Sequence, residues 1–415
     1  MTKRLIGILT DIDSLEKYQF WDFTVMSQIL DRGAKRRSAP PLLQNAFRPF
    51  FLGGALWAAI LVPLWAAEYM GWMPVVHGMT GHAHEMLYGF LAAIICGFSL
   101  TAIPNWTGRA PVAGAGLAAL FALWVFGRLA YLSVDNIWSH MVDLAFLIVL
   151  ALVVIREIAT GKNWRNLPVA VLITLFAASH IAFHQPEMSA VAIRATFGVA
   201  ALLIALIGGR IVPSFTRNWL TANNHPAASR VASPMQTVDM LMLGLTTAAL
   251  AGWVIFPFQA LVGGLLILAG LGQLYRMARW QGLATLREPL VWSLHAGFFW
   301  LIAALGLVGG AIVWPQAIPP AAGLHAMAAG LIGSMTLAVM TRASLGHTGR
   351  PRTASLLTTL IYILVHTGGG LRVLAAFNAN DPVWLVSAAG IWSAAFALFV
   401  VGYAPMLMGS KHTAG

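Results

Sequence analysis

The chain alternates long apolar stretches with short polar ones. A bilayer core requires roughly 20 apolar residues for each transmembrane helix, and twelve stretches approach that length. They are residues 50–70, 85–104, 113–133, 138–158, 167–185, 190–212, 236–257, 259–279, 290–311, 321–343, 354–376 and 383–407. This pattern predicts an all-α polytopic membrane protein with about twelve transmembrane helices.

The same pattern divides the chain into three parts. Residues 1–48 form an N-terminal segment, residues 49–407 a single transmembrane domain, and residues 408–415 a short tail. Acidic side chains interrupt the N-terminal segment, which excludes a signal peptide there. Residues 10–30 are expected either to form an interfacial helix with aromatic anchors or to belong to an irregular cytoplasmic tail.

Composition supports the membrane interpretation. Hydrophobic residues make up 59% of the chain and charged residues 9%, whereas soluble domains are about 45–50% apolar and about 25% charged. A surface of this size with so few charges is not that of a soluble globular protein. So many apolar residues also exclude a disordered chain.

The position of the positive charges predicts the orientation. Of the 25 Lys and Arg, 22 fall in the terminal segments or in alternate loops, which places them on one side if both termini are cytoplasmic. The net charge of +11 is therefore mainly a signal for orientation and for contact with anionic lipids. Binding to nucleic acid is not expected.

Three arginines depart from this distribution. Arg128, Arg194 and Arg372 each lie inside a predicted span, near its outer end. An ionisable residue inside a membrane is costly and usually has a partner or a function. The alternative is that each side chain extends to the outer headgroups.

Histidines concentrate in the same half of the membrane. Eight of the twelve are predicted between the bilayer centre and the outer face: His77, His82, His84, His140, His180, His184, His325 and His366. Neutral imidazole is the side chain that most often binds haem iron or copper. Any single one of these residues can also serve only in helix packing, so the cluster carries the hypothesis.

Spacing suggests which histidines act together. His180 and His184 are four residues apart and share a helix face, so they either chelate one metal or provide one ligand and its supporting partner. His82 and His84 diverge by about 200° on a regular helix and reach one metal only if that segment is extended. Otherwise His84 faces inward, and Glu85 can orient a neighbouring imidazole.

Two further histidines precede small residues. His325 is followed by a strip of small side chains at helical spacing: Ala326, Ala329, Gly330, Gly333 and Ser334. Such a strip indicates close helix packing or space for a flat macrocycle. His366 precedes three glycines and then Arg372, an arrangement that suits an axial haem ligand with the propionates directed outward.

Other cofactor classes lack their motifs. Cys96 is the single cysteine, which excludes an iron–sulfur cluster or a zinc finger within one chain. No nucleotide-binding loop, dinucleotide motif or hydrolase elbow is present.

Several segments resemble one known family. They are RPFFL at 48–52, HAHEMLYGF at 82–90, GRIVPSFTRNWL at 209–220, SLHAG at 293–297 and HAMAAGLIGSMTLAVMTRASLGHTGR at 325–350. Over residues 40–405 the chain resembles the NnrS family of bacterial inner-membrane proteins. The resemblance implies haem b, copper and a link to nitric oxide, nitrosative stress and denitrification. The histidines that match are His82, His84, His184, His295, His325, His347 and His366.

The leading hypothesis is a haem- and copper-containing protein that binds or processes nitric oxide or a nitrosative-stress species, with a possible redox partner. Haem is assigned to His84, His325 and His366, with Arg128, Arg194 and Arg372 for its propionates. Copper or a supporting role is assigned to His82, His180, His184 and Glu85. His295 and His347 are weaker candidates because both are predicted toward the cytoplasmic side.

Two other classes stay open. Twelve spans are common in transporters, so the chain is alternatively an exporter of a metal, haem or a nitrosylated species. A scaffolding subunit without a chromophore is the third possibility. No catalytic residue is assigned.

Overall fold

The computed structural model describes residues 38–75, 78–133, 136–379 and 381–411, and within these ranges every regular element is helical. The predicted all-α class is thereby confirmed. The hypothesis of an interfacial helix at residues 10–30 falls outside the described residues, as does His77.

Eleven helical segments are long and apolar enough to cross a membrane. They are Phe47–Tyr69 (α3), Gly78–Thr107 (α4, η3 and α5), Ala115–Ser133 (α6), Trp164–Phe183 (η4 and α8), Pro186–Ala222 (η5, α9, η6 and α10), Thr237–Ile255 (α11), Ala260–Ala278 (α12), Pro289–Val313 (α13), Pro320–His347 (α14, η9 and α15), Leu356–Phe377 (α16) and Pro382–Met408 (α17). Each occupies the position of a predicted span, which supports a polytopic membrane protein.

The remaining predicted span, 138–158, corresponds to a further helix. This helix, α7, covers Ile137–Thr160 and packs against α5, α6 and α8. It carries the buried carboxylates Asp143 and Glu157, and both are paired with arginines of other segments. Two carboxylate–arginine pairs therefore join this apolar helix to neighbouring segments.

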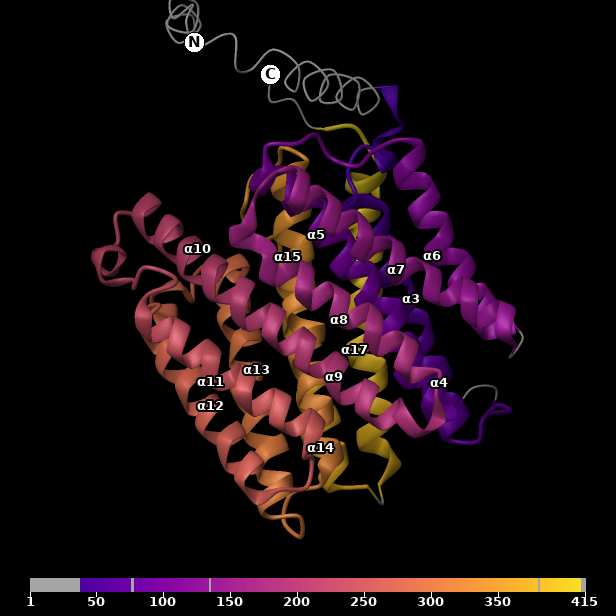
Figure 1. The fold of residues 1–415 in the computed structure, drawn as a ribbon. Helices are drawn as coiled ribbons and strands as arrows, with labels where there is room; N and C mark the ends of the chain where they lie inside the picture. The colour runs from indigo at the N-terminus through magenta and orange to yellow at the C-terminus, as the bar shows by residue number, and fades with distance from the viewer. Residues whose placement is uncertain (1–37, 76–77, 134–135, 380, 412–415) are drawn as a thin grey trace, which may run out of the picture.

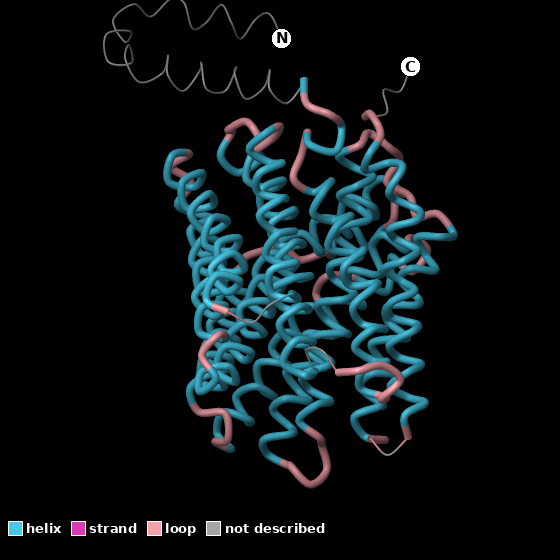
Figure 2. The backbone as a smooth tube through the Cα atoms, turned by 90° about the vertical axis from the view of Figure 1, so that its right-hand side faces the viewer, coloured by secondary structure: helices cyan, strands magenta, loops and turns pink. Residues whose placement is uncertain are grey.

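The helices run side by side in one elongated bundle (Figures 1 and 2). Arg48 at the start of α3 donates through Nη1 to the carbonyl oxygen of Leu407 near the end of α17, at 2.8 Å. We call the end of the bundle where α3 begins and α17 ends the terminal end. Helices α4 (Gly78–His84) and α14 (Pro320–His325) lie at the opposite end.

Three long segments contain a π-helical turn. These turns are η3 (Glu85–Leu91), η6 (Ile204–Gly208) and η9 (Ala326–Ile332). Such turns insert an extra residue into a helix and are frequent at functional sites. His84 directly precedes η3 and His325 directly precedes η9, so two predicted ligand positions stand where the helix widens.

The small-residue strip after His325 is used for packing. A Cβ on Gly330 would lie 2.4 Å from the Trp300 ring, and one on Gly333 would lie 2.6 Å from Nε1 of Trp392. Indole rings therefore fill the space that the sequence left open for a macrocycle. This packing is the commoner role of small residues between membrane helices.

Replacement of Gly330 by Ala is expected to destabilise the fold by about 1–3 kcal/mol, because overpacking displaces a neighbouring side chain. The matched control is Gly390→Ala at an exposed position of α17, where a Cβ meets nothing within 4 Å. Thermal unfolding in detergent measures both. Equal melting temperatures for the two variants would contradict the tight contact with Trp300.

Candidate metal centre

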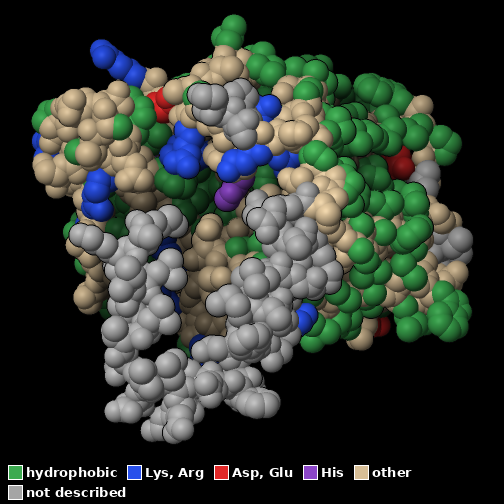
Figure 3. Space-filling view, turned by 90° about the horizontal axis from the view of Figure 1, so that it is seen from above, with side chains coloured by type: hydrophobic (Ala, Val, Ile, Leu, Met, Phe, Trp, Pro, Cys, Tyr) green, Lys and Arg blue, Asp and Glu red, His purple; other side chains and the backbone are tan. Residues whose placement is uncertain are grey.

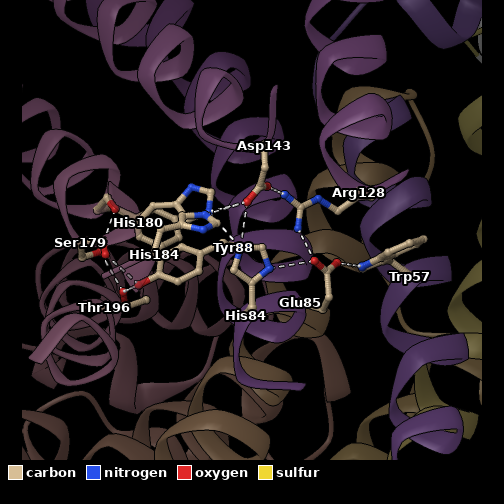
Figure 4. Close-up of polar contacts among 11 residues, drawn as sticks. Trp57, His84, Glu85, Tyr88, Arg128, Asp143, Ser179, His180, His184 and Thr196 are labelled. Carbon is tan, nitrogen blue, oxygen red and sulfur yellow. Dashed lines mark hydrogen bonds and ion pairs between the residues drawn. The ribbon is translucent and has the colours of Figure 1, made fainter. Parts of the chain in front are cut away.

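Four buried or half-buried side chains converge in the half of the bundle near the opposite end. They are His84, Asp143, His180 and His184, and one ligand atom from each lies within 4.8 Å of all the others. Figure 4 shows the three imidazoles directed at the carboxylate of Asp143. The residues come from α4, α7 and the end of α8 (Leu167–Phe183).

One carboxylate oxygen is the common neighbour of the three rings. Oδ2 of Asp143 lies 2.9 Å from Nε2 of His84, 3.0 Å from Nε2 of His180 and 3.2 Å from Nε2 of His184. The Nε2 atoms of His84 and His180 are 3.1 Å apart. For a tetrahedral ion with ligand distances of roughly 2.0 Å, neighbouring ligands stand about 3.3 Å apart. The observed separations are therefore compatible with these four atoms surrounding one metal ion.

Local sequence explains why these side chains meet. Asn136 caps α7 by accepting hydrogen bonds from the backbone of Trp138 and Ser139, so the start of the helix is fixed two turns before Asp143. His180 and His184 stand on one face of α8, as their spacing predicted. His84 ends α4 and faces the same point.

A second set of polar contacts holds the first. Arg128 donates through Nη1 to Oε1 of Glu85 at 2.7 Å and through Nη2 to Oδ1 of Asp143. Trp57 donates through Nε1 to the other Glu85 oxygen at 2.7 Å. Both carboxylates are thus fixed by groups from α3 and α6, which is how outer partners usually orient metal ligands.

Both ring nitrogens of His84 face carboxylate oxygens, and a neutral imidazole can donate to only one of them. Nδ1 of His84 lies 2.9 Å from Oε1 of Glu85, an acceptor only, and a neutral imidazole with its proton on this nitrogen has none on Nε2. Nε2 then directs its lone pair at Oδ2 of Asp143, which is also an acceptor. Two acceptors at 2.9 Å require either a second proton on His84 or a cation between them.

Aromatic rings fix the orientation of two imidazoles. Tyr131 stacks on His84 with ring centroids 3.6 Å apart and planes within 8°. Tyr88 stacks on His180 at 4.2 Å and 14°, and its hydroxyl bonds to Thr196 and to the backbone of Ser179. Nδ1 of His180 is buried without a hydrogen-bond partner among the described residues.

Charge also favours a cation. Glu85, Arg128 and Asp143 are each at most 1% exposed, so their charges are poorly screened by water. Two carboxylates against one guanidinium leave a net negative charge in a dry region. Burying a charge without compensation is costly, and a bound metal ion or a protonated histidine supplies the missing positive charge.

A second group of predicted residues lines a separate cavity. His82, His325 and Arg372 border a space of about 80 Å³ together with Trp65 and apolar side chains. His82 stacks on Trp65 with ring centroids 4.1 Å apart. Nδ1 of His325 bonds to the carbonyl oxygen of Ala321 at 2.8 Å, which leaves Nε2 of His325 for another partner.

The structure thus groups His82 and His84 differently from the sequence hypothesis. His84, assigned to haem, lies with His180 and His184, while His82, assigned to copper, lies with His325 and Arg372. The physical reason is the helical phase. Residues 78–84 are helical rather than extended, so side chains two residues apart point to opposite sides of the segment.

The other predicted residues lie apart from both groups. Nδ1 of His366 accepts from Trp300 at 3.0 Å, and its Nε2 is buried without a described partner. His295 bonds to Thr216 at 2.8 Å. Arg194 contacts the carbonyl oxygen of Val254 at 3.5 Å. His347 lines a cavity near the terminal end.

Arg128 has partners, as expected of an arginine inside a membrane, but its role differs from the assignment to a haem propionate. Its terminal nitrogens bond to two carboxylates of this chain, so it organises the cluster and is not directed at a propionate. Asp143 was not among the predicted ligands. The three arginines were noted because a charge inside a predicted span is costly. The same argument applies to Asp143, which lies in the predicted span 138–158, and could have identified it from the sequence.

Comparison with known protein families supports the resemblance seen in the sequence, whereas comparison with individual curated proteins finds none. No curated protein matches the sequence. The family described as NnrS protein matches residues 41–411. Because this match covers nearly the whole chain, the protein belongs to the NnrS family.

Proposed function

We propose that the protein is a membrane metalloprotein of nitric oxide or nitrosative-stress chemistry, with a copper ion held by His84, Asp143, His180 and His184. The observation that carries the proposal is the convergence of three imidazole nitrogens on one carboxylate oxygen within 3.2 Å. Membership of the NnrS family supports the nitric oxide link. The setting we propose is a bacterial inner membrane with cytoplasmic termini, which puts this centre in the outer half of the bilayer.

The donor set suits copper. Imidazole and carboxylate donors bind Cu(II), Zn(II) and Fe(II), and among divalent ions of the first transition row the affinity is highest for copper. Cys96 is buried on α5 (Ala92–Thr107) and is not part of the cluster. The site therefore offers nitrogen and oxygen ligands without a thiolate.

The chain supplies binding and orientation at this centre. Three histidines and Asp143 hold the ion, while Glu85, Arg128 and Trp57 keep His84 and Asp143 in place. A bound copper ion supplies a position for a small ligand such as nitric oxide and a centre that exchanges one electron. His184, 10% exposed in its side chain, is the least buried of the four ligands.

Haem b is the second cofactor that the family resemblance implies. His82 and His325 carry imidazoles of the kind that bind haem iron, and Arg372 is a cation that would pair with a propionate. The cavity between them measures about 80 Å³, far below the roughly 300–1,000 Å³ of pockets for drug-sized ligands. A porphyrin therefore does not fit in this conformation, and binding there requires neighbouring side chains such as Trp65 to move.

Metal analysis with spectroscopy tests the copper proposal. Purified full-length protein is expected to contain about one copper per chain, and the copper electron paramagnetic resonance signal is expected to change on addition of nitric oxide. His180→Ala should lose this copper and the response. His295→Gln, which changes a buried histidine outside the cluster, should keep both. Full copper content in His180→Ala would overturn the assignment.

A reduced-minus-oxidised absorption spectrum tests haem separately. If haem binds at the small cavity, His82→Ala and His325→Ala are expected to lose the haem bands, and His295→Gln to keep them. Unchanged bands in both alanine variants would place haem elsewhere in the chain. A spectrum without haem bands in the wild-type protein would remove haem from the proposal and leave the copper site unaffected.

Transport is the second candidate function, and a row of cavities supports it. The cavity at His82 shares Ile332 with a central cavity of about 100 Å³. The central cavity shares Phe98, Ile207 and Val339 with a larger one near the terminal end. Substrate movement into liposomes by protein without metal or haem would favour this alternative.

A further inference from the structure

The largest of these three cavities opens near the terminal end of the bundle. It measures about 540 Å³ and is bordered by the ends of α5 and α15 (Gly333–His347) and by α10 (Gly209–Ala222). Figure 3 shows Lys and Arg side chains gathered around a hollow on this face, next to a histidine. This volume falls within the range of pockets that bind small organic ligands, roughly 300–1,000 Å³.

Three arginines line this cavity. They are Arg210, Arg342 and Arg352, and no carboxylate from the described part of the chain lines it with them. Guanidinium groups stay charged at all physiological pH values. Three like charges around one space repel each other, and a bound anion would supply a counter-charge inside the cavity.

The surroundings hold the arginines in place, and Glu288, the carboxylate that acts electrostatically on Arg342, does not line the cavity. Arg342 lies over the Phe215 ring, with its guanidinium carbon 3.9 Å from the centroid. Arg210 donates through Nη1 to the side-chain oxygen of Asn166 at 3.2 Å, and its Nε is buried without a described partner. A Cβ on Gly346 would lie 3.2 Å from Nε of Arg352, so this glycine lets Arg352 lie against α15.

The rest of the lining is divided by polarity. Asn105, Ser214 and Asn218 supply neutral polar groups, whereas Phe98, Ile207 and Val339 form an apolar part shared with the central cavity. Such a lining suits a molecule with a charged head and a less polar body. Planar guanidinium groups bind phosphate oxygens in a bidentate manner, and several of them around one point suit a dianion.

We propose that this cavity is a binding site for a phosphate ester, held by Arg210, Arg342 and Arg352. The phosphate belongs either to the headgroup of an anionic lipid or to a soluble phosphate compound. The site is separate from the proposed copper centre, which lies toward the other end of the bundle and shares no residue with it.

Two binding measurements distinguish the sources. Full-length protein in phosphatidylcholine nanodiscs is titrated with glycerol 3-phosphate by calorimetry. Native mass spectrometry then detects lipid retained from nanodiscs that also contain phosphatidylglycerol. Arg342→Gln/Arg352→Gln is expected to weaken binding of the phosphate roughly 100-fold or more, because the variant removes two charged donors and the loss of each weakens binding about tenfold or more. Binding of glycerol 3-phosphate would identify the ligand as a soluble phosphate compound. Retention of phosphatidylglycerol would identify it as a lipid.

The control variant is Arg230→Gln, which removes an exposed positive charge of the loop after α10 that does not line the cavity. It should bind phosphate as the wild type does. Arg352→Gln alone is a second test, since Arg352 is exposed and its loss should not prevent folding. The proposal is overturned if neither probe binds the wild type, or if Arg230→Gln weakens binding as much as the double variant.

Discussion

Replacing Asp143 by Asn is expected to lower the affinity for copper more than 100-fold and to leave the purified protein almost free of the metal. Asp143 provides the proposed oxygen ligand, and its Oδ2 atom is the common neighbour of all three histidines. The amide keeps the volume but removes the negative charge. Loss of a supporting residue alone typically costs 10–100-fold in metal affinity, and loss of a charged ligand exceeds that.

The matched control is Glu157→Gln on the same helix. Glu157 is also buried, and its carboxylate pairs with Nε of Arg109 at 2.7 Å, but it lies outside the cluster. This variant removes a buried negative charge from α7 without touching the ligands. Elemental analysis should find normal copper in Glu157→Gln and little in Asp143→Asn. Equal loss in both variants would mean that metal content follows the stability of α7 and not ligation by Asp143.

Much of the helical arrangement follows from the sequence because a membrane imposes simple rules. Apolar runs of bilayer length predict the helices, and all twelve predicted positions are helical in the structure. The ends are less predictable. Residues 78–84 continue the predicted span 85–104 as helix, although polar side chains such as His82 and His84 had placed them outside it.

Contacts inside the bundle depend on helix rotation, which one sequence does not determine. The spacing of His180 and His184 predicted a shared face, and that face meets Asp143. Nothing in the spacing indicates whether His82 or His84 faces α7, since both positions are equally polar. The π turn of η3 begins directly after His84. It rotates the following side chains relative to a regular α-helix, and a prediction that assumes 3.6 residues per turn does not include this rotation.

The cavity with three arginines illustrates a further limit. Arg210, Arg342 and Arg352 were interpreted from the sequence only as signals of orientation, because Arg210 and Arg342 stand at the cytoplasmic ends of predicted spans and Arg352 lies in the loop after one. Their convergence on one cavity depends on the packing of α10 near α15, segments separated by more than 100 positions in the chain. The distribution of positive charges among the loops therefore predicted the end of the bundle where these arginines lie, but not the cavity that they line.

Replacement of Arg128 by Met is expected to destabilise the protein by about 3–5 kcal/mol, the typical cost of removing one partner from a buried ion pair. Arg128 is 1% exposed and is bonded to both Glu85 and Asp143. Its loss leaves two buried carboxylates without a cation. Unfolding in detergent, measured by circular dichroism in the absence of metal, gives the change in free energy.

Combining this change with Glu85→Gln distinguishes charge from packing. If unpaired carboxylates cause the loss, Arg128→Met/Glu85→Gln should be more stable than Arg128→Met, because one buried charge fewer is left uncompensated. Saturating copper should also restore more stability to Arg128→Met than to a chain that also carries Asp143→Asn, since a ligand stabilises only the state that binds it. A double variant less stable than Arg128→Met, together with no effect of copper, would show that the packing of the Arg128 side chain, and not its charge, supports the centre.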